Sequence, residues 1–123
     1  MLRAFVYGMV MVATTLVAAC SQKNVSYSRD IRPILDKNCA GCHAPGKSGF
    51  QASGFDVTTY QTLMKGGKFG ALIKPGDSFT SAFNMLVEGR AHPSLRMPHG
   101  REKLPDHDIE ILKVWVNEGA KND

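Results

Sequence analysis

The chain has 123 residues, which is room for one domain and too short for a barrel enzyme or a two-domain nucleotide-binding fold. Hydrophobic residues make up 43% and charged residues 21%, so the chain is neither a disordered polymer nor wholly embedded in a membrane. The formal net charge is +4, but the basic residues are dispersed and form no stripe, which argues against nucleic acid as a partner.

The first nineteen residues have the layout of an export signal. Arg3 supplies a positive start, and residues 4–19 follow without a charge and are mostly apolar. The stretch ends in Leu-Val-Ala-Ala before Cys20, which resembles a bacterial lipobox. This pattern predicts that residues 1–19 are cleaved, that Cys20 is lipidated, and that residues 20–27 form the lipidated N-terminus and a short tether.

Two alternatives to lipidation remain open, an uncleaved anchor helix and simple cleavage to a soluble form. All three place the domain outside the cytoplasm. The residue after the cysteine is Ser21 rather than Asp, which by the enteric sorting rule favours the outer membrane. We therefore expect a lipid-anchored protein of the periplasm or cell envelope.

The first helix is expected over 28–38, because Ile31, Ile34 and Leu35 recur on one helical face. It leads directly into Cys39-Ala40-Gly41-Cys42-His43, the C-x-x-C-H signature of covalent haem attachment. Two thiols at this spacing can add to the two vinyl groups on one edge of the porphyrin. The next residue, His43, then lies under the iron and can serve as the proximal ligand.

Two other uses of the cysteine pair fit less well. A redox dithiol or a disulfide does not need the following histidine, and no thioredoxin-like strand pattern surrounds the motif. A zinc site needs about four ligands, and the chain has no second C-x-x-C.

The rest of the chain is predicted to be short helices joined by long loops. Residues 44–56 hold a proline and several glycines and are expected to be a loop. A helix over 59–65 follows, capped by Thr58, and residues 74–77 form a turn. The next helix spans 79–88 and is capped by Ser78. The inward positions of that helix are Phe79, Ala82, Phe83, Leu86 and Val87.

A long loop over 90–105 leads to the last helix, expected over 106–118. Its apolar residues are Ile109, Ile111, Leu112, Trp115 and Val116. Together these elements predict an all-α domain of about four short helices over residues 28–120.

Met97 is the strongest candidate for the distal ligand of the iron. It lies in a polar, proline-bracketed loop rather than on an apolar helix face, and a thioether is a soft ligand for iron. His92 and His99 share this loop and are rival ligands, and an open site is a further alternative. Met64 and Met85 lie on or beside apolar helix faces and are expected to belong to the core.

These motifs resemble the class I c-type cytochromes, and most closely the planctomycete-type cytochrome c domain. The likeness runs from Tyr27 to Ala120 and includes Pro75-Gly76-Asp77 and Arg96-Met97-Pro98. It implies one haem c held by Cys39 and Cys42, with His43 as proximal ligand and Met97 as distal ligand. It also implies a small class I cytochrome c-like fold in which the first and last helices cross and pack.

With both axial positions filled, such a site transfers single electrons and is not expected to act as an enzyme. A rim of basic residues would steer an acidic redox partner. Three alternatives stay open: a small haem peroxidase, a haem-based sensor with a labile distal ligand, and a subunit of a larger redox enzyme. The sequence gives no oligomeric state. The residues of the expected rim are Lys47, Lys65, Lys68, Lys74, Arg90, Arg96, Arg101 and Lys103.

Overall fold

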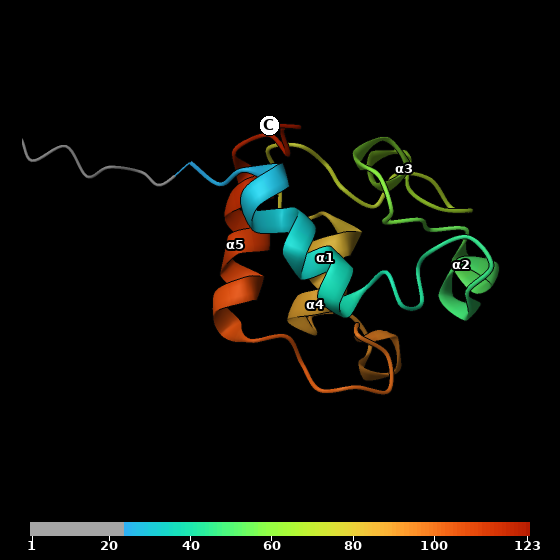
Figure 1. Cartoon of the computed structure of the whole chain (residues 1–123). Coiled ribbons are helices and arrows are strands. Elements are labelled where there is room, and N and C mark those ends of the chain that lie inside the picture. The colour runs from blue at the N-terminus through green and yellow to red at the C-terminus, as the bar shows by residue number, and fades with distance from the viewer. Residues whose placement is uncertain (1–23) are drawn as a thin grey trace, which may run out of the picture.

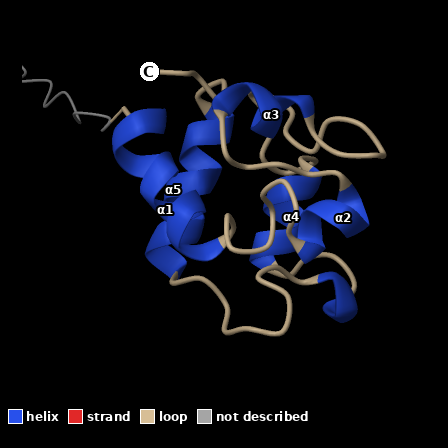
Figure 2. Cartoon of the chain, turned by 45° about the vertical axis from the view of Figure 1, so that its right-hand side comes forward, coloured by secondary structure: helices blue, strands red, loops and turns tan. Residues whose placement is uncertain are grey.

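The computed structural model describes residues 24–123, so Cys20 and the predicted export signal lie outside the described residues (Figure 1). The described part is built from helices and loops (Figure 2), and an isolated bridge between Gly67 and Gly70 is its only β pairing. The predicted all-α class is therefore confirmed. The elements are η1 (Tyr27–Ile31), α1 (Arg32–Asn38), α2 (Ser48–Ser53), α3 (Tyr60–Lys65), α4 (Ala82–Glu88), η2 (Pro93–Leu95) and α5 (Asp106–Asn117).

The first predicted helix is present as η1, one wide helical turn, followed directly by α1. It begins one residue earlier than expected, because the hydroxyl of Ser26 accepts from the backbone N–H of Arg29 and caps the first turn. Pro33 is accommodated because it lies in the first turn of α1, where a backbone donor has no partner inside the helix. The expected apolar face is buried, with Ile31 and Leu35 fully inaccessible.

The helix α5 packs against η1 and α4, and Figures 1 and 2 both show it beside α1. Leu112, Trp115 and Val116 lie in the core at 0–1% exposure, together with Ile31 and Leu35. Full burial of each such side chain stabilises the fold by about 1.5–3 kcal/mol. The predicted contact between the first and last helices is thus the core of the domain. Within residues 24–123, no helix is long and apolar enough to cross a membrane.

The predicted loop over 44–56 is wrong in one part, because it contains the short helix α2. Tertiary contacts hold α2 in place. The N–H of Phe50 donates to the carbonyl of Cys42 at 3.0 Å, and the ammonium of Lys68 donates to the carbonyls of Gln51 and Ala52. None of these partners is visible in the local apolar pattern.

The predicted helix over 79–88 begins three residues late, at Ala82. Residues 78–80 form a turn instead, in which Asp77 accepts from the N–H of Thr80 at 3.0 Å. Phe79 is consequently 75% exposed rather than inward, and the guanidinium of Arg90 lies 5.0 Å from its ring centre.

Two predicted caps also differ. Ser78 does not cap α4, because it is buried and its N–H donates to the side chain of Asn117. Thr59, rather than Thr58, caps α3 and exchanges hydrogen bonds with Thr62. Both corrections concern the first turn of a helix, where several neighbouring Ser and Thr residues are equally suited to cap by sequence.

Candidate cofactor site

The two motif cysteines lie on the turns that continue α1. The N–H of Cys39 donates to the carbonyl of Leu35 at 2.9 Å, and the N–H groups of Cys42 and His43 both donate to the carbonyl of Cys39. Both thiols are free, and Cys39 packs partly against the core whereas Cys42 is exposed. The helix therefore presents two thiols and an imidazole on one short, hydrogen-bonded segment.

His43 is positioned by two later parts of the chain. Its ring meets the ring of Phe55 edge-on, with ring centres 5.5 Å apart, and its carbonyl accepts from the N–H of Val57 at 2.9 Å. On the other side, the backbone of α2 approaches at Gly49. A Cβ atom at Gly49 would lie 3.0 Å from Cε1 of His43 and 2.8 Å from the carbonyl oxygen of Cys42. Sequence reasoning missed Gly49 and Phe55, although a glycine this close to the motif was a usable signal.

Burial lowers the pKa of His43 below its usual value, and contact with the backbone of Phe55 acts in the opposite direction. The imidazole is therefore neutral at pH 7 and has a lone pair to offer. Its Nδ1 is buried without a partner at hydrogen-bond geometry, and no side chain of residues 24–123 hydrogen-bonds its Nε2. Neither ring nitrogen is therefore engaged by a side chain of the described residues, and the imidazole has a nitrogen to offer to a metal.

The loop that carries Met97 comes close to the cysteine motif. Burial raises the pKa of the Cys39 thiol to about 11, and the positive charge of Arg101 acts against this rise. Arg101 is held in the same loop by its backbone, since its carbonyl accepts from the guanidinium of Arg96 at 3.1 Å. The charge of Arg101 thus acts on the pKa of a thiol about sixty residues away in sequence.

Met97 is attached to α4 and faces the interior. Its N–H donates to the carbonyl of Leu86 at 3.1 Å, and its side chain packs against the core while staying partly accessible. On the neighbouring turn of α4, Phe83 contacts Phe55, with ring centres 6.5 Å apart. Phe55 in turn contacts His43, so aromatic side chains connect α4 to the proximal histidine.

The other candidate ligands lie in different surroundings. His92 is exposed, and its Nδ1 is 2.8 Å from the hydroxyl of Ser94, whose backbone N–H also approaches it. His99 is exposed as well. Met64 packs partly against the core from α3, and Met85 is half-buried on α4. Among the rivals named for the distal position, Met97 is the one packed against the core.

The donor set fits a haem. Thiols, a neutral imidazole and a thioether are the protein groups that attach and ligate haem iron, and the porphyrin supplies the equatorial nitrogens itself. The unpartnered Nδ1 of the half-buried His43 and the close approach of Gly49 to its ring fit a histidine held in place to bind such a group. Within residues 24–123, no three or more His, Cys, Asp or Glu side chains gather into a metal cluster.

Comparison with known families gave one match. Residues 39–99 match the family model described as Planctomycete cytochrome C. The matched span runs from the first motif cysteine to the histidine just past Met97, and is shorter than the resemblance seen over 27–120. No curated protein and no solved structure matched the chain.

Proposed function

Because the chain belongs to the planctomycete cytochrome c family and so binds a covalent c-type haem in electron transfer, we propose that it is a lipid-anchored, single-haem electron carrier of the cell envelope with His43 and Met97 as axial ligands. The observation that carries this proposal is that Cys39 and Met97, which lie almost sixty residues apart in sequence, both pack against the same hydrophobic core. The backbone N–H of Met97 is hydrogen-bonded to the carbonyl of Leu86 in α4.

In this proposal the chain's own residues hold the cofactor from both sides. The thiols of Cys39 and Cys42 would hold the haem covalently, and the imidazole of His43, positioned by Phe55 and Gly49, would be one ligand of its iron. The thioether sulfur of Met97 would be the other ligand. The bound haem supplies a one-electron couple, and Met/His ligation raises its reduction potential.

The protein limits what else can reach the iron. Met97 fills the distal position, so an external ligand has to displace a side chain whose backbone is bonded to Leu86. The two histidines that share the loop of Met97, His92 and His99, are exposed rather than buried beside it, which disfavours them as the acid and base of peroxide chemistry. These features favour electron transfer over a peroxidase or a sensor.

We propose a narrower basic rim for the redox partner than the sequence suggested. Lys68 and Arg90 donate to backbone carbonyls, and Lys74 and Lys103 to nearby side chains. Lys47, Lys65 and Arg101 are exposed, and their side chains make no hydrogen bond or ion pair within residues 24–123. Of these, Arg101 is the one electrostatically coupled to Cys39, which makes it the natural centre of a docking face for an acidic partner.

The axial ligands are tested by absorption spectroscopy of protein made with a cytochrome c maturation system. We expect a low-spin oxidised spectrum with a sulfur-to-iron charge-transfer band that is lost in Met97→Ala and kept in the matched control Met64→Ala. A band that survives Met97→Ala, or a low-spin spectrum without the band, would reassign the distal position to another side chain. Mass spectrometry of protein from the membrane fraction tests the lipid on Cys20.

A further inference from the structure

The two ends of the described chain are bonded to each other. The N–H of Val25 donates to the carboxylate of Glu118 at 3.1 Å, and the N–H of Tyr27 donates to the carboxylate of Asp123 at 2.9 Å. The N–H of Ser28 and the hydroxyl of Ser26 both donate to the backbone carbonyl of Asp123. We call this set of contacts, between residues 24–28 and 118–123, the terminal clasp.

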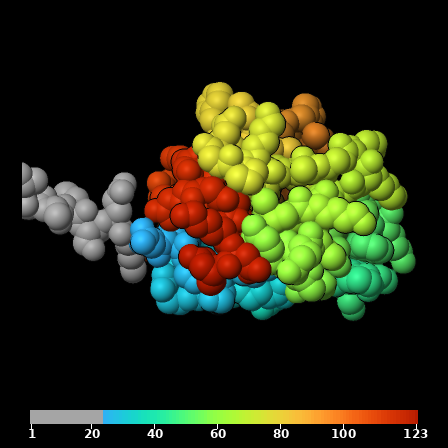
Figure 3. Space-filling view, turned by 90° about the horizontal axis from the view of Figure 1, so that it is seen from above, coloured from blue at the N-terminus to red at the C-terminus, as the bar shows by residue number. Residues whose placement is uncertain are grey.

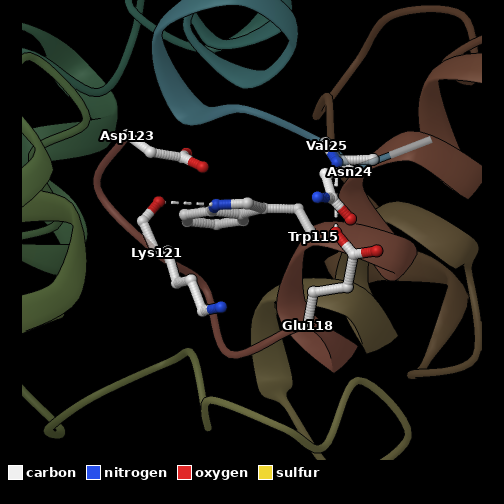
Figure 4. Close-up of a pocket in the computed structure, with 6 residues that line it drawn as sticks. All are labelled: Asn24, Val25, Trp115, Glu118, Lys121 and Asp123. Atoms are coloured by element: carbon white, nitrogen blue, oxygen red, sulfur yellow. Dashed lines mark hydrogen bonds between the residues drawn. The ribbon is translucent and has the colours of Figure 1, made fainter. Parts of the chain in front are cut away.

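The tail reaches the clasp by reversing direction after α5. Gly119 has a φ of 102° and Ala120 a φ of 49°, a left-handed pair that turns the chain back over the helix. The indole N–H of Trp115 then donates to the carbonyl of Lys121 at 3.0 Å, and the hydroxyl of Tyr60 donates to the carbonyl of Ala120. Figure 4 shows the clasp residues gathered around the indole of Trp115.

The clasp lies at the end of the domain opposite the cysteine motif. The η1 and α1 helices run for twelve residues from the clasp residue Tyr27 to Asn38, just before the motif, a rise of roughly 16–18 Å along the axis. Figure 1 shows the described chain entering at one end of this axis, with the segment after α1 leaving at the other. In Figure 3, residues near 25 and near 123 adjoin on one side, while residues near 50 lie on the far side.

The length of the tether decides which end can face a membrane. If Cys20 is lipidated, only four residue steps separate it from Asn24, a reach of about 14 Å when fully extended. A haem end facing the bilayer would hold Asn24 at least 16 Å away, which is beyond that reach. With the clasp open, the free tether extends to Tyr27 and reaches about 25 Å, so the domain could invert.

The short tether acts against an electrostatic attraction between the domain and the membrane. The side chains of Lys47 and Arg101, at the motif end, have no partner within residues 24–123, whereas at the clasp end Lys121 lies beside the two carboxylates of Glu118 and Asp123. An anionic membrane surface attracts basic groups, so an unrestrained domain would turn its motif end toward the lipid. The clasp opposes this attraction by keeping the tether short.

We propose that the terminal clasp orients the anchored protein with its cysteine-motif end facing away from the membrane, so that its partner is an acidic redox protein in the aqueous phase rather than one embedded in the bilayer. This inference rests on the lipid anchor proposed above. It adds a role for residues 24–28 and 118–123 that lies outside the residues matched by the family model.

The test is energy transfer to the haem from a headgroup-labelled lipid in phosphatidylethanolamine/phosphatidylglycerol vesicles carrying the full lipidated protein. We expect weak transfer for the wild type and for the control Asp108→Ala/Glu110→Ala, which removes two carboxylates of α5 outside the clasp. Transfer should rise several-fold when Glu118→Ala is combined with deletion of residues 121–123, which together remove the acceptors of all four clasp hydrogen bonds, and in a variant with a flexible insert between Cys20 and Asn24. This increase in energy transfer should disappear in purely zwitterionic vesicles or at high salt.

Wild-type transfer as strong as that of the lengthened-tether variant would overturn the proposal. Failure of the anchor itself is seen separately, as an unmodified Cys20 in the mass spectrum. In that case the Cys20 thiol of the same chain can be coupled to a maleimide lipid. The vesicle comparison then tests the clasp independently of natural lipidation.

Discussion

The helical end and the loop end of this domain are built in different ways. At the helical end, η1, α1 and α5 bury Ile31, Leu35, Leu112, Trp115 and Val116 almost completely, and the terminal clasp closes over them. At the loop end, Cys39, His43 and Met97 are only partly buried and are held mainly through backbone hydrogen bonds. One end therefore supplies its own hydrophobic core, and the other is completed by the group that it binds.

This difference shows how a domain of about a hundred residues can hold a large cofactor. A small core stabilises only modestly, so small folds often depend on a staple or a cofactor. Here the core is concentrated where no cofactor is needed, and the segments from 39 to 58 and 89 to 105 are left to shape the site. The following changes break one end and leave the other, in order of decreasing expected effect.

Removing both thiols should abolish cofactor attachment. In Cys39→Ser/Cys42→Ser we expect no haem that survives denaturing electrophoresis, because no thioether can form. The control Cys20→Ser should keep its covalent haem while losing the proposed lipid. Covalent haem in the double variant would contradict the assignment of these two cysteines.

Truncating the central aromatic residue should damage the helical end. Trp115 is 1% exposed, contacts Tyr27 with ring centres 5.8 Å apart and donates to the tail. Trp115→Ala should cost about 3–5 kcal/mol of unfolding free energy, measured by denaturant titration of the holoprotein. The exposed control Lys113→Ala should change it by under about 0.5 kcal/mol. Equal stability of the two variants would show that the core lies elsewhere.

A single methyl group should disturb the proximal side of the site. Gly49→Ala places a Cβ too close to the carbonyl of Cys42 and the ring of His43, so one of them has to shift. We expect a loss of about 1–3 kcal/mol together with a changed haem spectrum. Gly41→Ala is the matched control, because a Cβ there meets no atom within 4 Å. If both variants behave alike, the close approach at Gly49 has no part in positioning His43.

The smallest effect is expected at Asp56. This residue precedes Val57, whose backbone N–H donates to the carbonyl of His43. Burial raises the pKa of this carboxyl, but hydrogen bonds from the backbone and hydroxyl of Thr58 outweigh it and leave the pKa below its ordinary value of 3.8. A depressed folded pKa contributes stability above pH 3.8 that is lost as the pH falls through the folded value. Asp56→Asn should therefore cost about 1 kcal/mol at pH 7, and that difference should shrink as the pH falls below 3.8. A difference that stays constant with pH would assign the effect to packing.

Sequence reasoning was most successful where a signal is local. The helix over 28–38 and the last helix follow from apolar periodicity, and the C-x-x-C-H motif predicts the attachment chemistry from five adjacent residues. The helix α2 was missed because its hydrogen bonds come from Cys42 and Lys68 rather than from its own sequence. Phe79 was placed inward by periodicity, whereas the turn at Asp77 moves the start of the helix past it.

In the candidate site, too, the residues that were predicted are those with a local sequence signal. Cys39, Cys42 and His43 are adjacent in the chain, so their proximity needed no fold. The contributions of Gly49 and Phe55 are tertiary contacts and became visible only in three dimensions. The clasp is the extreme case, because its partners are more than ninety residues apart.

The central claim is that both axial positions of the iron are filled by the protein, one of them by Met97. Carbon monoxide added to the reduced holoprotein tests this most directly, because it binds where a distal ligand is absent or readily displaced. A closed carrier predicts an unchanged absorption spectrum for the wild type and a clear carbon monoxide adduct for Met97→Ala. Ready binding to the wild type would contradict the carrier and favour a sensor or a peroxidase.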